Sequence, residues 1–409
     1  MHPTVFKIPY LPEWLADIKS YGVMMMIAFL TGIWMACRRA MRSQANPDIV
    51  LNLGFISLIA GVAGARIMFV WHYWDTRFAN QPHPWAAVFD IRAGGLEFWG
   101  GPLLTIPAIY IYLRFFAKAS ARWYMDMLAP SLAWGLAITR IGCFLNGCCW
   151  GSVCVDQHDP ARMHAEVPWA VRFPYGSPAM LQQYHFGQLT LPRELLYQGP
   201  TTAAEPIARE FLDAAIADDG KTLHQLRENM DAAARRAQAT TQSDAEDLQR
   251  NKDALAEARK AYFTHQISPV GLVEQQASRY GLTVRQLAAL ADHYRSKPVH
   301  PTQLYEMISG MLISWLLSIM FYYRRRHGIL LPWFLILYSI SRYLLEAIRQ
   351  DNPLDVGGVT ISQAISFGTF AAGVIALIYI YKALPEIGPG VKKFVLPDDE
   401  PPTARPIRA

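Results

Sequence analysis

Apolar segments of about 20 residues, the length of a helix that crosses a bilayer core, recur along this sequence. Seven segments qualify as predicted spans: 21–37, 49–71, 96–116, 123–145, 306–323, 329–347 and 360–381. Charged residues make up only 17% of the 409 residues and are crowded into 204–263. This distribution predicts an all-α, polytopic transmembrane protein with a helical soluble insertion. It excludes a disordered chain, a collagen-like chain and a disulfide-rich mini-protein.

Basic residues predict the orientation of these spans. They cluster after the first, third, fifth and seventh spans, at Arg38-Arg39 and Arg42, Lys118 and Arg122, 324–326, and Lys382 with Lys392-Lys393. With seven spans, all four clusters fall on one side, which the positive-inside rule makes cytoplasmic. We therefore predict an N-terminus outside and a C-terminus inside. The same rule explains the net charge of +5 without a nucleic-acid partner.

The chain divides into four predicted parts. Residues 1–175 hold spans one to four and the loop that follows, 298–384 hold spans five to seven, and 385–409 form a cytoplasmic tail. Residues 176–297 form an insertion outside the membrane. The composition of 204–263 favours two or three amphipathic helices with a break at Asp219-Gly220. Residues 272–296 predict two shorter helices joined at Tyr280-Gly281, and we interpret the whole insertion as a solvated helical cap.

Polar residues inside the predicted spans indicate a functional site, because a charge in a spanning helix usually faces a cavity or a partner. In the predicted topology they all lie near the outer ends of six spans: Tyr21, Arg66, Glu97, Arg140, Glu306, Arg342, Glu346 and Arg349. We expect them to converge at one depth, near the headgroups of the outer leaflet.

The sixth span is the most informative of these. Tyr338, Arg342, Glu346 and Arg349 are spaced 4, 4 and 3 residues apart, which places them on one helical stripe. Two guanidinium groups beside one carboxylate leave positive charge for an anion, and Arg suits bidentate phosphate binding. With Arg140 at the same depth, the predicted ligand is a phospholipid headgroup. The alternative is an ion pair that joins helices and binds no ligand.

Two local patterns allow a structural and a functional interpretation. Glycine pairs at 94–95 and 100–101 permit close backbone approach or an unusual turn at a helix start, and they equally suit helix packing. In the segment HPTQLYE at 300–306, Thr302 is a candidate N-cap of the fifth span. Glu306 has a second interpretation as an acid–base group, because a carboxylate at the membrane interface can have a raised pKa.

Taken together, these motifs resemble the prolipoprotein diacylglyceryl transferase family. Nine blocks occur in the family's order: YG at 21–22, GAR at 64–66, GGLEFWGG at 94–101, Asp126 with Pro130, RIGCFLNGCCWG at 140–151, PWAVRFP at 168–174, HPTQLYE at 300–306, RYLLEAIRQ at 342–350 and SQAIS at 362–366. They cover about 20–175 and 298–381. Each block is a modest signal, but nine in order are specific.

The resemblance implies an enzyme of the bacterial cell (inner) membrane that needs no cofactor and no metal. Such an enzyme transfers the diacylglyceryl group of phosphatidylglycerol to the thiol of a lipobox cysteine, forming a thioether and releasing glycerol phosphate. The implied partners are phosphatidylglycerol, the signal peptide and lipobox of a prolipoprotein, and membrane lipids.

The resemblance also implies roles for individual residues. Arg140 and Arg342 would bind the phosphate, Asn146 would hydrogen-bond the headgroup, and Glu346 would orient the arginines. The catalytic candidates are Arg140, Arg342, Glu346, Glu306 and His300. The substrate-binding candidates are Tyr21, Arg66, Gly100, Gly101, Asn146, Gly147 and Arg349.

The sequence departs from the family pattern at several of these positions. Trp99 stands where the family usually has His, Cys143 replaces an Asn, and Cys148 replaces an acidic residue. These changes leave the base for the substrate thiol unassigned, although an Arg-rich pocket can itself lower the pKa of an incoming thiol. They also support an alternative hypothesis, a non-enzymatic relative that binds lipid or lipoprotein.

Four of the five cysteines fall close together, at Cys143, Cys148, Cys149 and Cys154. On the predicted outer side they form a structural disulfide or remain free thiols, and these are the favoured interpretations. A metal site is disfavoured because the spacing is unlike common zinc patterns and no nearby His pair supports it. Thiol redox chemistry at Cys148-Cys149 gives a third hypothesis, a membrane thiol oxidoreductase. Cys37 is predicted to be buried on the inner side.

Overall fold

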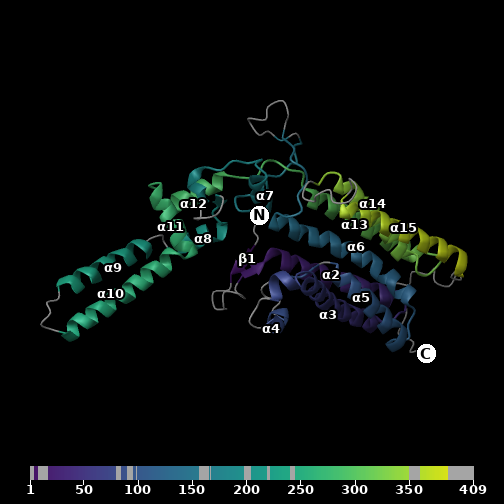
Figure 1. Cartoon of the computed structure of the whole chain (residues 1–409). Coiled ribbons are helices and arrows are strands. Elements are labelled where there is room, and N and C mark those ends of the chain that lie inside the picture. The colour runs from purple at the N-terminus through teal and green to yellow at the C-terminus, as the bar shows by residue number, and fades with distance from the viewer. Residues whose placement is uncertain are drawn as a thin grey trace. The chain divides into compact units, whose positions relative to one another are not determined.

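The computed structural model describes residues 4–7, 17–79, 84–89, 95–97, 99–155, 165, 167–197, 204–218, 222–239, 245–349 and 360–385 (Figure 1). The chain forms two compact units. The first, the helical unit, combines His2–Gly151 with Pro301–Ala409. The second, the insertion unit, is Ser152–His300. The predicted tail 385–409 lies, except for Pro385, outside the described residues.

Long apolar helices build the helical unit. They are α2 (Ser20–Arg42), α3 (Pro47–His72), α5 (Gly100–Ile111), α6 (Ala121–Asn146), α13 (Thr302–Tyr323), α14 (Leu330–Glu346) and α15 (Ile361–Ala383). Five of these, α2, α3, α6, α13 and α15, are long and apolar enough to cross a membrane. The prediction of a mostly helical chain with several membrane-spanning helices is therefore confirmed.

Smaller elements complete this unit. They are a hairpin of β1 (Thr4–Lys7) and β2 (Asp17–Lys19), the short helix α4 (Pro84–Phe89), and the π-helices η1 (Trp74–Phe78) and η2 (Tyr112–Phe116). Helix α5 continues directly into η2, and the two together form an apolar helix over Gly100–Phe116.

The third predicted span is shorter than expected. Its helix begins at Gly100 rather than at 96, because Gly95 adopts a left-handed backbone with φ +87 and residues 95–97 are not helical. Glu97 therefore precedes the helix and does not lie within it. The remaining segment, Gly100–Phe116, is about 25 Å long at the rise of an α-helix, slightly less than a typical bilayer core.

Helix termini follow local capping rules. The Asn46 side chain accepts a hydrogen bond from the Asp48 N–H at the start of α3, and Thr360 forms a capping box with Gln363 at the start of α15. The predicted cap of the fifth span by Thr302 is wrong. Pro301 occupies the N-cap of α13, and the Thr302 hydroxyl instead donates to the Cys149 carbonyl oxygen at 2.7 Å.

Helix α6 is the centre of the helical unit, and α2, α13 and α14 pack against it. Buried alanines on α6, at Ala129, Ala133 and Ala137, let the neighbouring helices approach. Helices α3 and α5 form a second close pair. A Cβ added to Gly100 would lie 2.1 Å from the Gly64 carbonyl oxygen, so the predicted close approach at this glycine pair is confirmed.

Six helices are described in the insertion unit. They are α7 (Pro178–His185), α8 (Arg209–Ala217), α9 (Thr222–Ala239), α10 (Ala245–Gln266), α11 (Pro269–Arg279) and α12 (Val284–His293). Helices α7, α8, α11 and α12 surround a separate apolar core, and α9 and α10 form a longer pair. A 3-10 turn (Arg193–Leu195) leads into β3 (Leu196–Tyr197), which pairs with β4 (Glu205–Pro206).

The helices expected in the insertion are present. Helices α8, α9 and α10 occupy the charged segment, and α9 lies alongside α10 (Figure 1). Helices α11 and α12 meet at Tyr280-Gly281, where Gly281 has φ +68. The predicted break at Asp219-Gly220 lies outside the described residues.

Candidate active site

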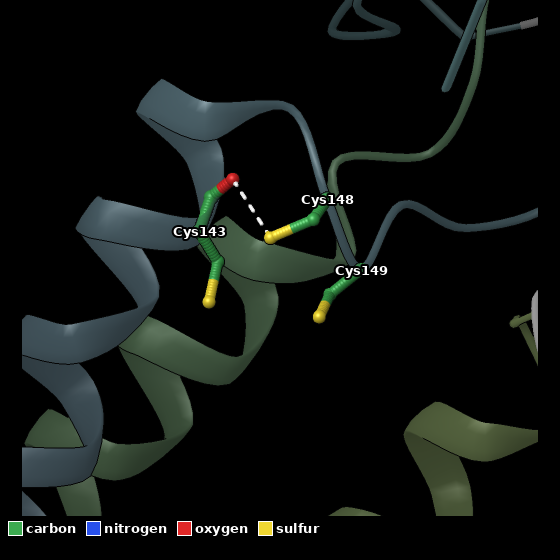
Figure 2. A group of neighbouring side chains, drawn as sticks. All are labelled: Cys143, Cys148 and Cys149. Carbon is green, nitrogen blue, oxygen red and sulfur yellow. Dashed lines mark hydrogen bonds between the residues drawn. The ribbon is translucent and has the colours of Figure 1, made fainter. Parts of the chain in front are cut away.

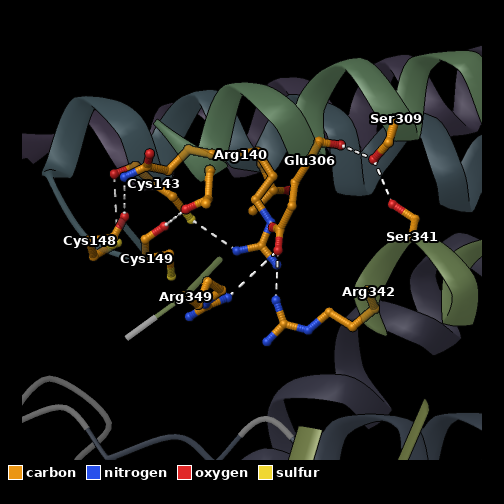
Figure 3. Close-up of polar contacts among 12 residues, drawn as sticks. Arg140, Cys143, Cys148, Cys149, Glu306, Ser309, Ser341, Arg342 and Arg349 are labelled. Carbon is orange, nitrogen blue, oxygen red and sulfur yellow. Dashed lines mark hydrogen bonds and ion pairs between the residues drawn. The ribbon is translucent and has the colours of Figure 1, made fainter. Parts of the chain in front are cut away.

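Glu306 is the centre of a cluster of arginines in the helical unit (Figure 3). It lies one turn into α13, and its side chain is 9% exposed. Its carboxylate forms ion pairs with Arg140 of α6, with Arg342 of α14 at 2.6 Å and with Arg349 at 3.6 Å. Three guanidinium groups from different parts of the chain therefore converge on one carboxylate. We call these residues, with Glu346, the Glu306 cluster.

Arg342 has further partners that fix its guanidinium. Its Nη2 lies 3.1 Å from Glu346 Oε2, one turn along the same helix. Its Nε and Nη2 also donate to Ser362 Oγ at 3.1 and 2.9 Å, and Thr360 Oγ1 donates to Glu346 Oε1 at 3.0 Å. The start of α15 therefore holds both members of the Arg342–Glu346 pair. Three arginines against two glutamates leave the cluster with one excess positive charge.

A small pocket lies beside this cluster, between α6, α13 and α14. Arg140, Glu306 and Arg342 line its polar part. The remaining lining is largely apolar and includes Ala133, Leu136, Ile313, Phe334 and Leu345. Positive charge beside an apolar lining matches a ligand that carries both an anionic group and a hydrocarbon portion.

The loop after α6 is held against the first turn of α13. Gly147 ends α6 in the left-handed conformation, with φ 75, and its N–H donates to the Cys143 carbonyl oxygen. Gln303 Nε2 then donates to the Cys148 carbonyl oxygen at 2.6 Å, as Thr302 does to that of Cys149. Gly151 pairs with Arg349 in an antiparallel bridge. This loop thus connects α6, α13 and the short segment that follows α14.

All five cysteines are free, so the disulfide that was one of the favoured interpretations is not formed in this structure. The sulfur atoms of Cys143, Cys148 and Cys149 lie within 4.8 Å of one another (Figure 2). Hydrogen bonds from Cys143 and Cys148 lower the pKa of the Cys149 thiol, and the positive charges of Arg140 and Arg349 act in the same direction. The three thiols therefore share hydrogen bonds next to two positive charges.

Two further predicted residues lie beside the same end of α6. Tyr21, in the first turn of α2, faces Gly142, where an added Cβ would meet Tyr21 Cα at 3.2 Å. Asn146 ends α6, and its side chain hydrogen-bonds to the Cys148 thiol. Gly147 contributes the helix cap described above. Both residues are thus close to Arg140 along the chain or in space, since Asn146 is on α6 itself and Tyr21 packs against Gly142 of α6.

Other predicted residues have partners elsewhere. Arg66 donates to the carbonyl oxygens of Val88, Ala87 and Gly95, at 2.8, 2.8 and 2.9 Å, so its guanidinium holds the segment between α3 and α5. The close contact of Gly100 with Gly64 joins α3 to α5, and Gly101 is buried in the same helix. His300 belongs to the insertion unit, where its N–H donates to the Ser152 carbonyl oxygen.

Sequence reasoning missed several polar groups. Thr360 was not considered, although its capping box with Gln363 is a recognisable sequence signal. Ser309 and Ser341, whose hydroxyls hydrogen-bond at 3.0 Å, also line the pocket. His72 Nδ1 lies 3.3 Å from Glu97 Oε2, and Glu97 is two residues before Trp99.

Comparison with known proteins decides the family. The sequence model described as prolipoprotein diacylglyceryl transferase matches residues 6–207 and 247–379, well over half of the chain. The chain belongs to the prolipoprotein diacylglyceryl transferase family. The matched regions contain all five members of the Glu306 cluster and the three grouped cysteines. The unmatched residues 208–246 hold α8 and α9 of the insertion unit.

Curated relatives carry the name phosphatidylglycerol–prolipoprotein diacylglyceryl transferase. The protein of Vibrio vulnificus is 32% identical over 186 residues, which are 44% of this chain and 62% of the relative. That of Pseudoalteromonas translucida is 32% identical over 178 residues, 43% and 59% of the two chains. That of Nitratidesulfovibrio vulgaris is 33% identical over 164 residues, 40% and 56%. The chain thus spans about three fifths of the length of these relatives.

Proposed function

We propose that this protein transfers the diacylglyceryl group of phosphatidylglycerol to the lipobox cysteine thiol of a prolipoprotein. The observation that carries this proposal is the excess positive charge of the Glu306 cluster beside a partly apolar pocket. A phospholipid has the matching parts, an anionic phosphodiester next to hydrocarbon. The family and the names of its relatives support the same substrates.

The reaction needs a stabilised leaving group. The sulfur of the peptide attacks the carbon of the diacylglyceryl group that carries the phosphate ester. A C–S bond forms at this carbon, and its C–O bond to the phosphate breaks. The electron pair leaves with glycerol phosphate. In this proposal Arg140 and Arg342 donate to the phosphate oxygens, where charge increases as the bond breaks. Because the two arginines are already fixed by carboxylates and by Ser362, little reorganisation accompanies the reaction.

The remaining members of the cluster have supporting roles in the proposal. Glu306 holds three guanidinium groups together, so we assign it a positioning role, and Glu346 does the same for Arg342. The surplus positive charge stabilises the peptide thiolate, which is the nucleophile. Arg349 adds to that charge, and Asn146 hydrogen-bonds the headgroup. We assign Tyr21, which faces α6 at Gly142, to shaping the site and to accepting the thiol proton.

We also propose the full membrane topology. The five long apolar helices, together with the shorter helices Gly100–Phe116 and α14, give seven spans. The N-terminus then lies outside and the C-terminus inside. Support comes from the basic clusters, which all fall on one side of seven spans. The site then opens towards the outer leaflet of the bacterial inner membrane, where phosphatidylglycerol and a membrane-anchored peptide can both enter from the bilayer.

The experiment uses the full chain, purified and placed in nanodiscs that contain phosphatidylglycerol. A synthetic lipobox peptide is added, and both glycerol phosphate and the lipidated peptide are measured by mass spectrometry. We expect equal amounts of the two products from the wild type and a large loss in Arg342→Ala. Arg38→Ala is the matched control, because Arg38 is an exposed arginine near the C-terminal end of α2, whereas Tyr21 and the site lie at the N-terminal end. Peptide-independent release, or equal rates in Arg342→Ala, would contradict the proposal.

The grouped thiols keep a second candidate open, a membrane thiol oxidoreductase. Replacing Cys148 and Cys149 together by Ser separates the two functions. Under the transferase proposal most of the lipid transfer survives this change, whereas an oxidoreductase loses its active pair. A folded wild type that binds phosphatidylglycerol but releases no glycerol phosphate would instead favour the non-enzymatic lipid-binding alternative.

A further inference from the structure

Three thiols lie close together at the end of α6. Cys143 lies in the last turn of the helix, and Cys148 and Cys149 follow its left-handed cap at Gly147. Each pair of sulfur atoms is within 4.8 Å, and the three form a triangle (Figure 2). Cys143 is buried, and the other two are partly buried. The group is thus a preformed set of soft ligands from a short stretch of sequence.

The surrounding fold holds these thiols in place. Cys149 has φ 59, a left-handed conformation that non-glycine residues rarely adopt and that often marks functional sites. The carbonyl oxygens of Cys148 and Cys149 accept hydrogen bonds from Gln303 and Thr302, whose side chains are almost completely buried. The loop is therefore fixed from α13 before any ligand binds, which reduces the entropy cost of bringing three ligands together.

The geometry suits a three-coordinate metal ion. In a planar, three-sulfur site, a metal–sulfur bond of about 2.3 Å puts the sulfurs about 4.0 Å apart. This spacing is compatible with the three sulfurs here, which all lie within 4.8 Å of one another. Zinc in structural sites almost always takes four ligands. Among the described residues, this group contains three cysteines and no His, Asp or Glu. A soft ion that accepts three thiolates, Cu(I), is the better match.

The local charge also favours such a complex. Three thiolates and one Cu(I) have a net charge of −2, which would be costly in a partly buried site without cations. Arg140 Nη1 lies 3.9 Å from Cys143 Sγ, and the charges of Arg140 and Arg349 both act on Cys149. The arginines that surround Glu306 on one side therefore offset thiolate charge on the other.

We propose that Cys143, Cys148 and Cys149 form a three-thiolate binding site for Cu(I). The metal displaces three thiol protons and takes part in no electron transfer. When bound, it ties the loop after Gly147 to the last turn of α6. This site shares Arg140 with the Glu306 cluster but takes no part in the proposed transfer reaction, and its test does not depend on transferase activity.

The test is a Cu(I) titration of the full-length protein in detergent, reduced and without oxygen, against a coloured Cu(I) chelator. We expect one tightly bound Cu(I) per chain, and X-ray absorption at the copper edge should show three sulfur neighbours. Cys149→Ser should reduce the affinity at least 100-fold. Cys37→Ser is the matched control, because Cys37 lies on α2 outside the group, and it should bind like the wild type.

Three results would overturn the proposal. They are no stoichiometric Cu(I) binding by folded wild type, unchanged affinity in Cys149→Ser, and copper coordinated by nitrogen or oxygen rather than by three sulfurs. Tighter binding of Zn(II) than of Cu(I) would also contradict it. If Cys149→Ser does not fold, as judged by its melting curve, Cys148→Ser provides the same comparison.

Discussion

The helical unit contains two clusters of arginine and carboxylate on the same helix, and they differ in ways that separate structure from function. Asp126 lies near the start of α6 and Arg140 near its end, about 21 Å apart at the rise of an α-helix. Both positions lie in segments that the sequence predicts to span the membrane. Each places charged groups among apolar helices, where a charge without partners is costly.

The Asp126 cluster is balanced and closed. Its carboxylate accepts hydrogen bonds from the N–H groups of Gly328 and Leu330, at 2.7 and 2.9 Å, and pairs with Arg324 at 3.1 Å. The Asp126 and Arg324 side chains are 0% and 2% exposed. One negative charge meets one positive charge, and the backbone at the start of α14 supplies the remaining donors. This arrangement fixes how α13, α14 and α6 meet.

The Glu306 cluster is unbalanced and open. Three arginines meet two glutamates, the Arg140 and Arg342 side chains are 19% and 16% exposed, and a pocket adjoins them. An unbalanced set of buried charges favours a counterion. The comparison teaches that charge balance and an adjacent pocket, rather than burial alone, distinguish a ligand-binding ionic cluster from a structural one.

Replacing Asp126 by Ala is expected to have the largest effect. It leaves Arg324 buried without its carboxylate, which typically costs about 3–5 kcal/mol of stability. The thermal melting temperature and the yield of folded protein should both fall sharply, while the transfer rate per folded molecule should stay close to that of the wild type. An unchanged melting temperature in this variant would contradict a structural role for the Asp126 cluster.

Arg140→Ala should give the opposite profile. The transfer rate should fall about 100- to 1,000-fold, equivalent to about 2.7–4 kcal/mol, as for other preorganised donors to a developing negative charge. The melting temperature should change little, because Arg342 and Arg349 still neutralise Glu306. A loss of folding in step with activity would show that the Glu306 cluster is structural too.

Gly100→Ala tests a family motif that lies in neither cluster. The added Cβ would meet the Gly64 carbonyl oxygen at 2.1 Å, so the α3–α5 contact must open at a cost of about 1–3 kcal/mol. Gly135→Ala is the matched control, since an added Cβ there has nothing within 4 Å. Only Gly100→Ala should lower the melting temperature. Equal melting temperatures for both variants would contradict a packing role.

Ser362→Ala should have the smallest effect. It removes the hydroxyl that accepts hydrogen bonds from Arg342 Nε and Nη2 but keeps both ion pairs of that residue. Loss of this contact should slow transfer about fivefold, which corresponds to about 1 kcal/mol. Steady-state rates over a range of phosphatidylglycerol concentrations provide the measurement. A rate loss as large as that of Arg140→Ala would indicate that Ser362 itself contacts the substrate.

Much of this arrangement could be predicted because hydropathy and the cost of buried charge are local properties of the sequence. They identified the long helices and the arginines that meet at the outer end of the predicted spans. Glu306 was predicted to belong to the site, but its place at the centre of the arginines was not. The stripe on one helix suggested Glu346 between two arginines, whereas Glu306 has that position, because pairing across helices depends on how α6, α13 and α14 pack.

Other differences have the same origin. Arg66 looked like a member of the site, but the segment before α5 turns back and places three carbonyl oxygens around it. The grouping of Cys143 with Cys148 and Cys149 depends on the left-handed turn at Gly147 and on hydrogen bonds from α13. These contacts form only when the chain folds, so they cannot be predicted from the spacing of residues in the sequence.

The most direct test of the central claim measures which lipid the Glu306 cluster retains. Native mass spectrometry of the purified chain, with phosphatidylglycerol and diacylglycerol offered in equal amounts, compares ligands that differ in the phosphate. We predict that the wild type retains phosphatidylglycerol, that Arg342→Ala does not, and that Arg38→Ala behaves like the wild type. Equal retention of the two lipids by the wild type, or undiminished phosphatidylglycerol on Arg342→Ala, would contradict the account.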